Sequence, residues 1–320
     1  MSARPTGEAG LGAFLFVYGK GWMTTKLELV RGSTVLDLSD NAAYVWEGDD
    51  SFGMAPVGNI TERAPQQHGA TVLGFRLQPR IIQLALVGLA DSETARYTRR
   101  TQLMSMLAPV PGDFDVGLAL RLTRPDGTFR QIDCVFNGGL TLPRRDKLGL
   151  AQRLGVELLC ADPTWYDPAG EAVTFNLSGG PTGAIPMAVP TPIGASTIDQ
   201  TKSIVYAGNW RTYPLIYIYG PITNPILENT STGDVLDFTG TTIASGKYYA
   251  IDCRYGFKTV YDGDGVNRIS NLTASSDIAT FQIAPDPATV GGLNSLRARG
   301  SAISASTKIE VTYYTRYLGV

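Results

Sequence analysis

The chain has a single histidine, His68, among its 320 residues, and this limits the chemistry that it can perform. Most zinc sites, and most activated serine or cysteine nucleophiles, depend on histidine as a ligand or as a general base. The three cysteines, Cys134, Cys160 and Cys253, are odd in number and far apart, which makes a poor disulfide framework for so long a chain. We therefore expect buried free thiols, and no metal or cofactor.

The common phosphate, dinucleotide, hydrolase and zinc signatures are all missing from the sequence. One run, Asp262-Gly263-Asp264-Gly265 followed by Asn267, resembles half of a calcium loop. Such a loop needs further oxygen ligands and usually a distal glutamate, whereas Val266 and Arg268 stand where more ligands would be needed. Because Asp-Gly is itself a strong turn signal, we expect a tight hairpin turn here.

Paired carboxylates occur at three places in the sequence. They are Asp49 and Asp50, Asp113 and Asp115, and Asp234 and Asp237. The two acids of a glycosidase must face each other across a cleft, and closeness in the sequence does not show that. We expect these acids to lie in surface turns, and we expect no enzymatic activity.

Aromatic residues are frequent in the C-terminal half, where they could form a platform for a sugar. They include Trp210, Tyr213, Tyr217, Tyr219, Tyr248, Tyr249 and Tyr255. Packing in cores and interfaces is the more common use of such side chains. Packing is therefore our first expectation, and a sugar site is the alternative.

The charge balance and the composition favour a β-rich protein with large contacts. Lysine and arginine number 27 and aspartate and glutamate 29, so a broad phosphate-binding face is not expected. The 36 glycines and 19 prolines favour many strands joined by turns. No apolar run reaches 18 residues, and the first ten residues show no signal pattern, so we expect no membrane insertion and assembly in the cytoplasm.

The segments before residue 90 read mainly as strands. Short β segments are expected in Leu11–Leu38, and a loop in Asn41–Gly58, which is rich in Gly, Asp and Pro. Further strands are expected at Thr71–Leu77, after a turn at His68-Gly69, and at Arg80–Leu89, whose apolar run is typical of a buried strand.

Only Asp91–Ala108 looks strongly helical, with Asp91 and Ser92 as capping residues and Pro109 as the stop. The apolar residues near one face are Tyr97, Leu103, Met104 and Leu107. Three arginines, Arg96, Arg99 and Arg100, lie mostly off that face. We expect them to be solvated, because the chain as a whole is not basic.

Two strand pairs are expected after the helix. The strands Val116–Leu122 and Phe129–Phe136 flank Pro125-Asp126-Gly127, which is a turn sequence. A second pair, Gly139–Leu142 and Leu150–Cys160, is joined by the loop Pro143–Gly149. Three basic residues of this loop, Arg144, Arg145 and Lys147, are our candidates for an interface, with a solvated hairpin tip as the alternative.

The breaker-rich stretch Gly179–Ser196 separates the two halves of the chain. We therefore expect two domains, residues 1–168 and 169–320. Strands at roughly ten-residue spacing in the second half are typical of a β-sandwich. They are Tyr213–Tyr219, Ile226–Asn229, Val235–Phe238, Tyr248–Asp252, Lys258–Tyr261, Thr280–Ile283 and Lys308–Tyr314.

An ordered series of segments resembles the siphophage distal tail proteins. The series comprises the strand and arginine-rich helix of Arg80–Pro109, the run Asp133–Tyr166 with its NGGLTL and GVELLCADPTWYD, the long stretch AGNWRTYPLIYIYGPITNPILENTSTGDVLDFTG, then YYAIDC and VTYYTRYLG. Together these segments cover most of the chain, whereas residues 1–58 show little resemblance, so the pairing of the first strands stays open.

The resemblance implies a structural protein of the phage virion and no catalytic residues. It implies a hexameric ring at the distal tail tip, between the tail tube and the hub or adsorption apparatus, with accessory or receptor-binding proteins as further partners and DNA only as passing cargo. The N-terminal β domain, with its helix and a long hairpin, would build the ring, and a galectin-like sandwich would face outward. The alternatives are a carbohydrate-binding tail-tip protein and a glycan-cleaving enzyme.

Overall fold

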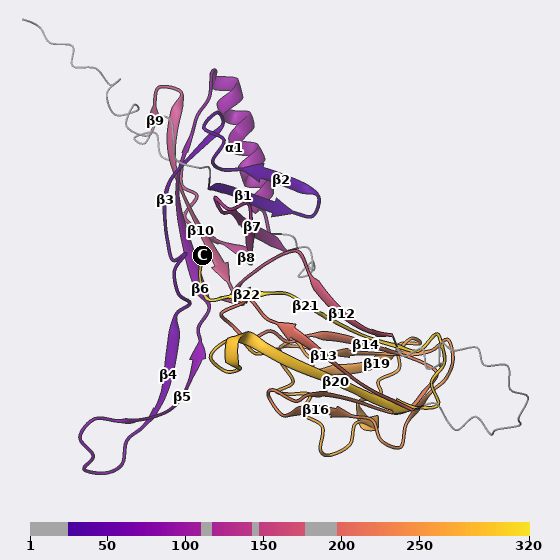
Figure 1. Ribbon diagram of the computed structural model, residues 1–320. Coiled ribbons are helices and arrows are strands. Elements are labelled where there is room, and N and C mark those ends of the chain that lie inside the picture. Colours follow the sequence, from indigo (N-terminus) through magenta and orange to yellow (C-terminus); the bar gives the residue numbers. More distant parts are fainter. Residues whose placement is uncertain (1–24, 110–116, 143–146, 177–196) are drawn as a thin grey trace, which may run out of the picture.

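The computed structural model describes residues 25–109, 117–142, 147–176 and 197–320, and it is built almost entirely of antiparallel strands (Figure 1). The first half holds a sheet of ten strands with the main order β2-β1-β7-β8-β10-β6-β3. These strands are β1 (Lys26–Arg31), β2 (Thr34–Asp37), β3 (Tyr44–Asp50), β6 (Arg80–Gly88), β7 (Leu118–Thr123), β8 (Phe129–Gly138) and β10 (Ala151–Cys160). Three short strands complete it: β9 (Lys147–Leu148), β11 (Trp165–Tyr166) and β22 (Arg316–Tyr317).

The long strand β8 links two portions of this sheet. Its residues Phe129–Cys134 pair with β7, and its later residues, from Val135 to Gly138, pair with β10. Apolar side chains alternate along β6 and β10, so that Ile82, Leu84 and Leu86 of β6 point into one core. The expected hairpin between β7 and β8 is confirmed, because Gly127 has a φ of 81° and Asp126 accepts a hydrogen bond from the Thr128 amide.

The helix α1 (Glu93–Leu107) covers this core, as Figure 1 shows. Its N-terminus is capped by Ser92, whose hydroxyl accepts from the Ala95 amide at 3.1 Å. The carbonyls of Ser105 and Met106 at its other end accept from the Arg31 guanidinium, so a strand side chain satisfies groups that the helix leaves unpaired. Both expected boundaries of the helix are therefore correct to within two residues.

The expected faces of α1 are wrong in part. Tyr97 and Met104 are 59% and 45% exposed, whereas Arg96 is buried, and Arg99 and Arg100 are half-buried. The inward face also carries Leu103, Met106 and Leu107. Arginine can occupy an inward position because its long apolar stem packs against the core while its guanidinium reaches polar groups beyond it.

Two other expectations for the first half also need correction. The segment expected as a loop, Asn41–Gly58, contains β3, which is an edge strand paired with β6 alone and broken by an irregularity between Trp46 and Gly48. An edge strand tolerates glycine and acidic residues that a central strand would not. Gly139–Leu142 is not a strand, and the segment that pairs with the start of β10 in its place is β9, inside the expected loop.

The second half is a β-sandwich of two antiparallel sheets. One has the order β12-β21-β14-β18-β19 and the other the order β13-β20-β15-β16, with β17 beside β15. The first consists of β12 (Glu171–Asn176), β21 (Lys308–Tyr313), β14 (Leu215–Tyr219), β18 (Tyr248–Asp252) and β19 (Thr259–Asp262). The second consists of β13 (Ile198–Val205), β20 (Leu293–Ser301), β15 (Ile222–Asn229), β16 (Asp234–Asp237) and β17 (Thr242–Ile243). Two 3-10 helices lie at Ile269–Asn271 and Val290–Gly292.

A second hydrophobic core lies between these sheets, separate from the first. The predicted sandwich is confirmed, although one expected strand is absent: Thr280–Ile283 makes only an isolated bridge from Ile283 to Thr212. The Thr280 amide instead donates to the Asp277 carbonyl, so this residue lies in a turn. A galectin-like topology is not tested by these observations and stays a prediction.

The last residues of the chain return to the first half. Strand β22 pairs with β11, and the Arg80 guanidinium donates to the Leu318 carbonyl at 2.7 Å. Arg80 is 1% exposed and also donates to the carbonyls of Ser51 and Gly53. The two-domain division at residue 168 stays a prediction, and these contacts connect the C-terminal segment to the first core.

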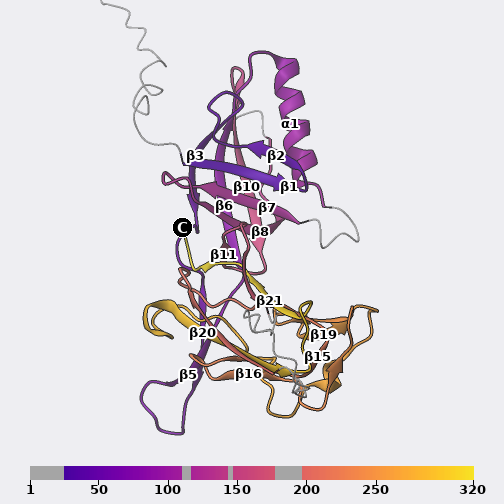
Figure 2. The same cartoon turned by 45° about the vertical axis from the view of Figure 1, so that its right-hand side comes forward.

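A separate two-stranded sheet, β4 (Val57–Glu62) paired with β5 (Thr71–Leu77), extends away from the ten-stranded sheet (Figures 1 and 2). It is the long hairpin of the first half. Within the described residues, no helix is long and apolar enough to cross a membrane.

Candidate interaction surfaces

The β4–β5 hairpin exposes an unusual number of large apolar side chains. Its residues Val57, Ile60, Val72, Leu73 and Phe75 are between 42% and 64% exposed. The lone histidine, His68, is also exposed, in the turn that joins the two strands. Since a two-stranded hairpin is at best marginally stable in water, a projecting apolar hairpin is a surface that needs a partner.

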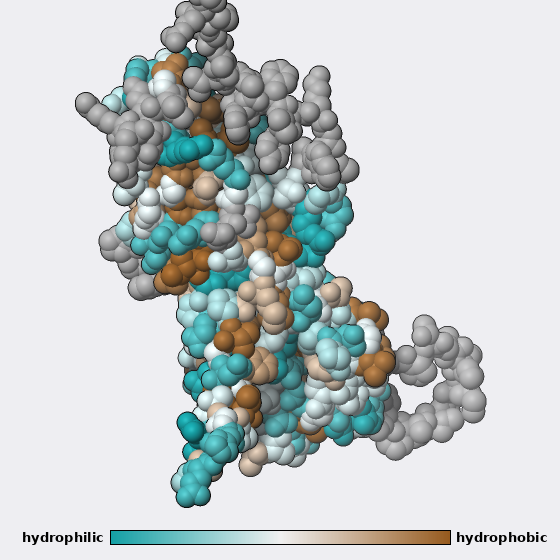
Figure 3. Space-filling model, turned by 90° about the vertical axis from the view of Figure 1, so that its left-hand side faces the viewer, coloured by the Kyte–Doolittle hydropathy of each residue, from teal (hydrophilic) through white to brown (hydrophobic). Residues whose placement is uncertain are grey.

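A second apolar surface lies on the outer face of the ten-stranded sheet. Leu159 of β10 is directly opposite Ile81 of β6 on one side and Val135 of β8 on the other. Ile81 is 44% exposed, Val135 is 56% exposed, and Leu159 is half-buried. These three residues, which we call the outer row, form a continuous cross-strand strip. Figure 3, which views the molecule from one side, shows that hydrophobic patches reach the surface in both halves.

A groove lies where β5, the segment before β11 and the second half of the chain meet. We call it the aromatic groove, and it encloses about 970 Å³. Its aromatic side chains are Phe75, Trp210, Tyr213, Tyr255 and Phe257, and its arginines are Arg76, Arg211, Arg254 and Arg316. Phe75 of the hairpin lies with its ring centroid 6.3 Å from that of Trp210, so the hairpin contributes to one wall.

Ring contacts order one side of the aromatic groove. The rings of Tyr213 and Tyr255 meet edge to face at 4.7 Å, and the Tyr213 hydroxyl donates to the Tyr255 hydroxyl at 3.0 Å. The Lys258 ammonium lies 4.2 Å from the Tyr213 ring centroid. Burial lowers the pKa of Lys258, and burial together with Tyr255 raises the pKa of Tyr213 to about 12. The Tyr213 hydroxyl therefore keeps its proton at neutral pH.

The opposite side of the aromatic groove is held by polar contacts. Arg316 donates to the Asp162 carboxylate and, at 2.6 Å, to the Thr164 hydroxyl. The Thr164 hydroxyl in turn donates to Asp162. These contacts connect the C-terminal segment to the exit from β10. What remains open is a surface of exposed aromatic rings, since Tyr255 and Phe257 are 73% and 54% exposed.

The predicted interface loop is only partly within the described residues. Arg144 and Arg145 lie outside them, and Lys147 lies in β9, where its backbone pairs with Gln152 of β10. The role of this loop as an interface stays a prediction.

The acidic run of the second half is a tight turn, as the sequence indicates. Asp262 accepts hydrogen bonds from the amides of Asp264 and Val266 and from the Arg268 guanidinium. Gly265 has a φ of 78°, which favours glycine. These donors occupy the Asp262 carboxylate and lower its pKa, the Val266 amide most strongly. Among the described residues, no three potential metal-ligating side chains of His, Cys, Asp or Glu gather in one place.

The remaining candidates separate in space. All three cysteines are buried free thiols, as expected. Asp234 and Asp237 accept from the hydroxyls of different neighbours, Thr232 and Thr239. The side chains of the other two acidic pairs lie outside what the structure describes.

The aromatic residues singled out from the sequence divide into three groups. Trp210, Tyr213 and Tyr255 line the aromatic groove. Tyr217, Tyr219 and Tyr248 contact one another through their rings on one sheet, with centroids 5.6–6.1 Å apart. Tyr249 is buried in the core. Sequence reasoning missed the apolar hairpin and the outer row, because residues 71–77 and 80–88 carry apolar side chains on both faces and do not show which of them stay exposed.

Comparison with known proteins supports the fold. No protein-family model matches this chain, and no curated protein sequence matches it. Among solved structures, the Dit protein of phage SPP1, described as a paradigm of the hub adsorption apparatus in phages that infect Gram-positive hosts, matches with a TM-score of 0.59. The match has 13% sequence identity and covers 91% of this chain and 98% of that one. A chain of the activated phage P2 baseplate with calcium has a TM-score of 0.47, at 11% identity over 91% of this chain and 98% of that one. The match to SPP1 Dit confirms the resemblance to distal tail proteins at the level of fold.

Proposed function

We propose that this chain is a structural protein of a long, non-contractile phage tail, which forms a hexameric ring at the distal tip. The ring would join the tail tube to the hub or adsorption apparatus, as part of a virion assembled in the host cytoplasm. Support comes from the fold, which is shared with SPP1 Dit over 91% of this chain. The proposal includes no catalysis, and DNA would pass through the ring only as cargo.

The observation that carries this proposal is the apolar β4–β5 hairpin. A ring needs a repeated contact in which one surface of each subunit meets a different surface of the next. The hairpin offers the projecting half of such a contact, because Val72 and Leu73 are 64% and 61% exposed. Burying these side chains against a neighbour would supply the stability that an isolated hairpin lacks.

The outer row is an exposed apolar surface that the apolar hairpin of a neighbouring subunit could contact. Ile81, Leu159 and Val135 present a flat apolar strip on paired strands, which suits a large permanent interface. The edge strand β3 lies beside β6 and leaves one side of its backbone unpaired within the described sheet. The same edge would be protected in a ring, as open sheet edges normally are. The loop with Arg144, Arg145 and Lys147 stays a proposed contact with a neighbour or with the tail tube.

The test is the mass of the purified full chain by native mass spectrometry and light scattering. We expect a species of six times the 34.3 kDa chain mass. Val72→Asp should weaken assembly at least tenfold, because it places a charge in the contact. Val205→Asp is the matched control, since Val205 is similarly exposed, at 71% against 64% for Val72, but lies on β13 of the second half. A wild-type chain that stays monomeric at high concentration, or equal effects of the two variants, would refute the proposal.

The aromatic groove favours one second candidate function, carbohydrate binding at the tail tip. Exposed rings beside arginines are suited to stacking against a sugar face while donating to its hydroxyls. Tyr255→Ala should then abolish binding on a glycan array, and Tyr97→Ala, which removes an exposed tyrosine of α1, should not. Absence of any bound glycan for the wild-type chain would remove this candidate and leave the ring proposal intact.

A further inference from the structure

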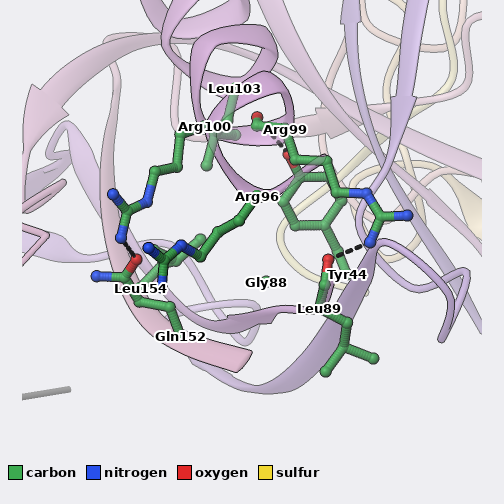
Figure 4. Close-up of a pocket in the computed structure, with 9 residues that line it drawn as sticks. All are labelled: Tyr44, Gly88, Leu89, Arg96, Arg99, Arg100, Leu103, Gln152 and Leu154. Carbon is green, nitrogen blue, oxygen red and sulfur yellow. Dashed lines mark hydrogen bonds between the residues drawn. The ribbon is translucent and has the colours of Figure 1, made fainter. Parts of the chain in front are cut away.

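A small cavity lies between α1 and the adjoining ends of β6 and β10, outside every surface described above. Its volume is about 20 Å³. The side chains that matter are Arg96, Arg99 and Arg100 from the helix and Gln152 from β10. Figure 4 shows Arg96 between the other two arginines, with its guanidinium beside Gln152. Arg96 is 6% exposed and Gln152 is 2% exposed, so both are more than nine-tenths buried.

Part of the hydrogen-bonding capacity of this cluster is already used. Arg99 donates to the Ala42 carbonyl at 3.1 Å and to the Leu89 carbonyl. Arg100 donates to the side-chain oxygen of Gln152, and Arg96 donates to the Glu93 carboxylate. These contacts fix the three guanidiniums around the cavity.

Four buried N–H groups are left without an acceptor among the described residues. They are Arg96 Nε and Nη1, Arg100 Nε and Gln152 Nε2. Buried polar groups are nearly always paired, and leaving several unpaired in one place is costly. This cluster therefore indicates a missing acceptor.

The missing acceptor has the character of an anion. A water molecule would accept from these groups, but its own hydrogens would then face a cluster whose unpaired atoms are all donors. The local charge agrees, because three guanidiniums are balanced by two carboxylates, Glu93 at Arg96 and Asp40 near Arg99. An anion would supply acceptors and reduce the excess positive charge together.

The size of the cavity limits the choice. A cavity needs a volume of about 10–15 Å³ to hold one water molecule. The volume here is about 20 Å³, which leaves room for one or two oxygen atoms. A carboxylate group is negatively charged, and its two oxygen atoms match this size. Arg99 and Arg100 are half-buried, so the cavity has an opening to the surface. We propose that Arg96, Arg100 and Gln152 form a binding site for one carboxylate group, supplied by a free carboxylate ion or by a side chain of a neighbouring copy of this chain. This proposal does not depend on the ring.

The test compares sodium formate with sodium gluconate at equal concentration and pH 7, using the full chain. Formate is small enough to enter the cavity and gluconate is not. We expect a saturable rise in the Tm of the wild-type chain in formate alone, because a ligand that binds only the folded state stabilises it. We expect ¹³C-labelled formate to show a matching saturable change in its NMR line width. Arg96→Met should abolish both effects.

The control variant is Arg153→Met, which removes an exposed arginine from the same strand as Gln152. It should keep the formate response of the wild-type chain. Should Arg96→Met not fold, Arg100→Met serves in its place and should weaken the response at least tenfold. Equal responses of the wild-type chain to formate and gluconate, or a full response in Arg96→Met, would overturn the proposal.

The oligomeric mass in formate distinguishes the two sources of the carboxylate, a neighbouring copy and a free ion. If a side chain of a neighbouring copy supplies it, formate should compete and lower the oligomeric mass measured by light scattering. If a free ion supplies it, formate should leave that mass unchanged while it raises Tm. Both results support the site and differ only in the source.

Discussion

The buried thiols give the clearest prediction at the scale of single residues. Burial raises the pKa of Cys253 to about 12, and contact with Cys160 and burial raise the pKa of Cys134 well above its usual range. In the unfolded chain both thiols ionise near pH 8.5–9. Because the pKa of each thiol is higher in the folded chain, its contribution to stability is complete below the pKa of the unfolded chain. That contribution is lost as the pH rises toward the pKa of the folded chain. The free energy of unfolding should therefore fall above about pH 9, by about 1.4 kcal/mol per pH unit for each thiol.

Chemical denaturation between pH 7 and pH 10.5 measures how steeply the free energy of unfolding falls with pH. Cys253→Ala should remove the part of this slope that comes from Cys253. Native thiols should also resist a thiol reagent at pH 8 that reacts rapidly with the unfolded chain. Equal reaction rates for the folded and unfolded chains would show that the thiols are not protected.

Local sequence patterns predict the conformation of residues that contact their neighbours in the chain. They do not predict contacts with residues that are far away in the sequence. Asp126-Gly127 and Asp262-Gly263 gave correct turns because a turn is made by neighbours in the chain. Arg96 was predicted to be solvated because the sequence cannot reveal that Gln152 of β10 lies beside its guanidinium. Its burial depends on three elements meeting, and no spacing within the helix contains that information.

At the scale of elements, the orientation of α1 is open to a direct test. Leu103→Ala should lower the free energy of unfolding by about 2–5 kcal/mol, because Leu103 is 1% exposed and its truncation leaves a cavity. Met104→Ala is the matched control and should change it by less than about 0.5 kcal/mol, since Met104 lies on the outer face. Arg99→Ala should cost about 1–3 kcal/mol, because two carbonyls lose their donor.

Urea denaturation of the three variants separates the two orientations of the helix. A silent Leu103→Ala together with a destabilising Met104→Ala would mean that the helix packs through the opposite face.

Strands were predictable where apolar residues dominate and were missed where polar residues alternate on an exposed face. Strand β14, with its run LIYIY, and β6 were both expected. Strands β13 and β20, which pair with each other along their whole length, were not. Their exposed faces carry Asp199 and Arg297, which form an ion pair across the two strands. Such a strand looks like a polar loop until its partner is known.

The fold class, the approximate position of the helix and the likeness to distal tail proteins could all be predicted at the scale of the whole molecule. What could not be predicted is how the last residues rejoin the first half. β22 contributes only two residues, and its pairing with β11 spans about 150 residues of chain, so no local signal exists for it. The aromatic groove has the same origin, because its walls come from β5, the segment before β11 and the second half.

Arg80 couples the two halves of the molecule, and this coupling carries the last prediction. Its buried guanidinium holds the carbonyls of Ser51, Gly53 and Leu318, so it joins β3, the hairpin base and the C-terminal segment. Arg80→Met removes the donors and should lower the free energy of unfolding by about 2–5 kcal/mol. In differential scanning calorimetry the wild-type chain should unfold in one transition, and Arg80→Met should unfold in two, because each half then melts on its own core. Arg297→Met, which breaks only an exposed ion pair with Asp199, should keep a single transition within about 0.5 kcal/mol of the wild-type stability. A single transition at unchanged Tm in Arg80→Met would show that the halves are coupled by other contacts, and two transitions already present in the wild-type chain would show that they are not coupled at all.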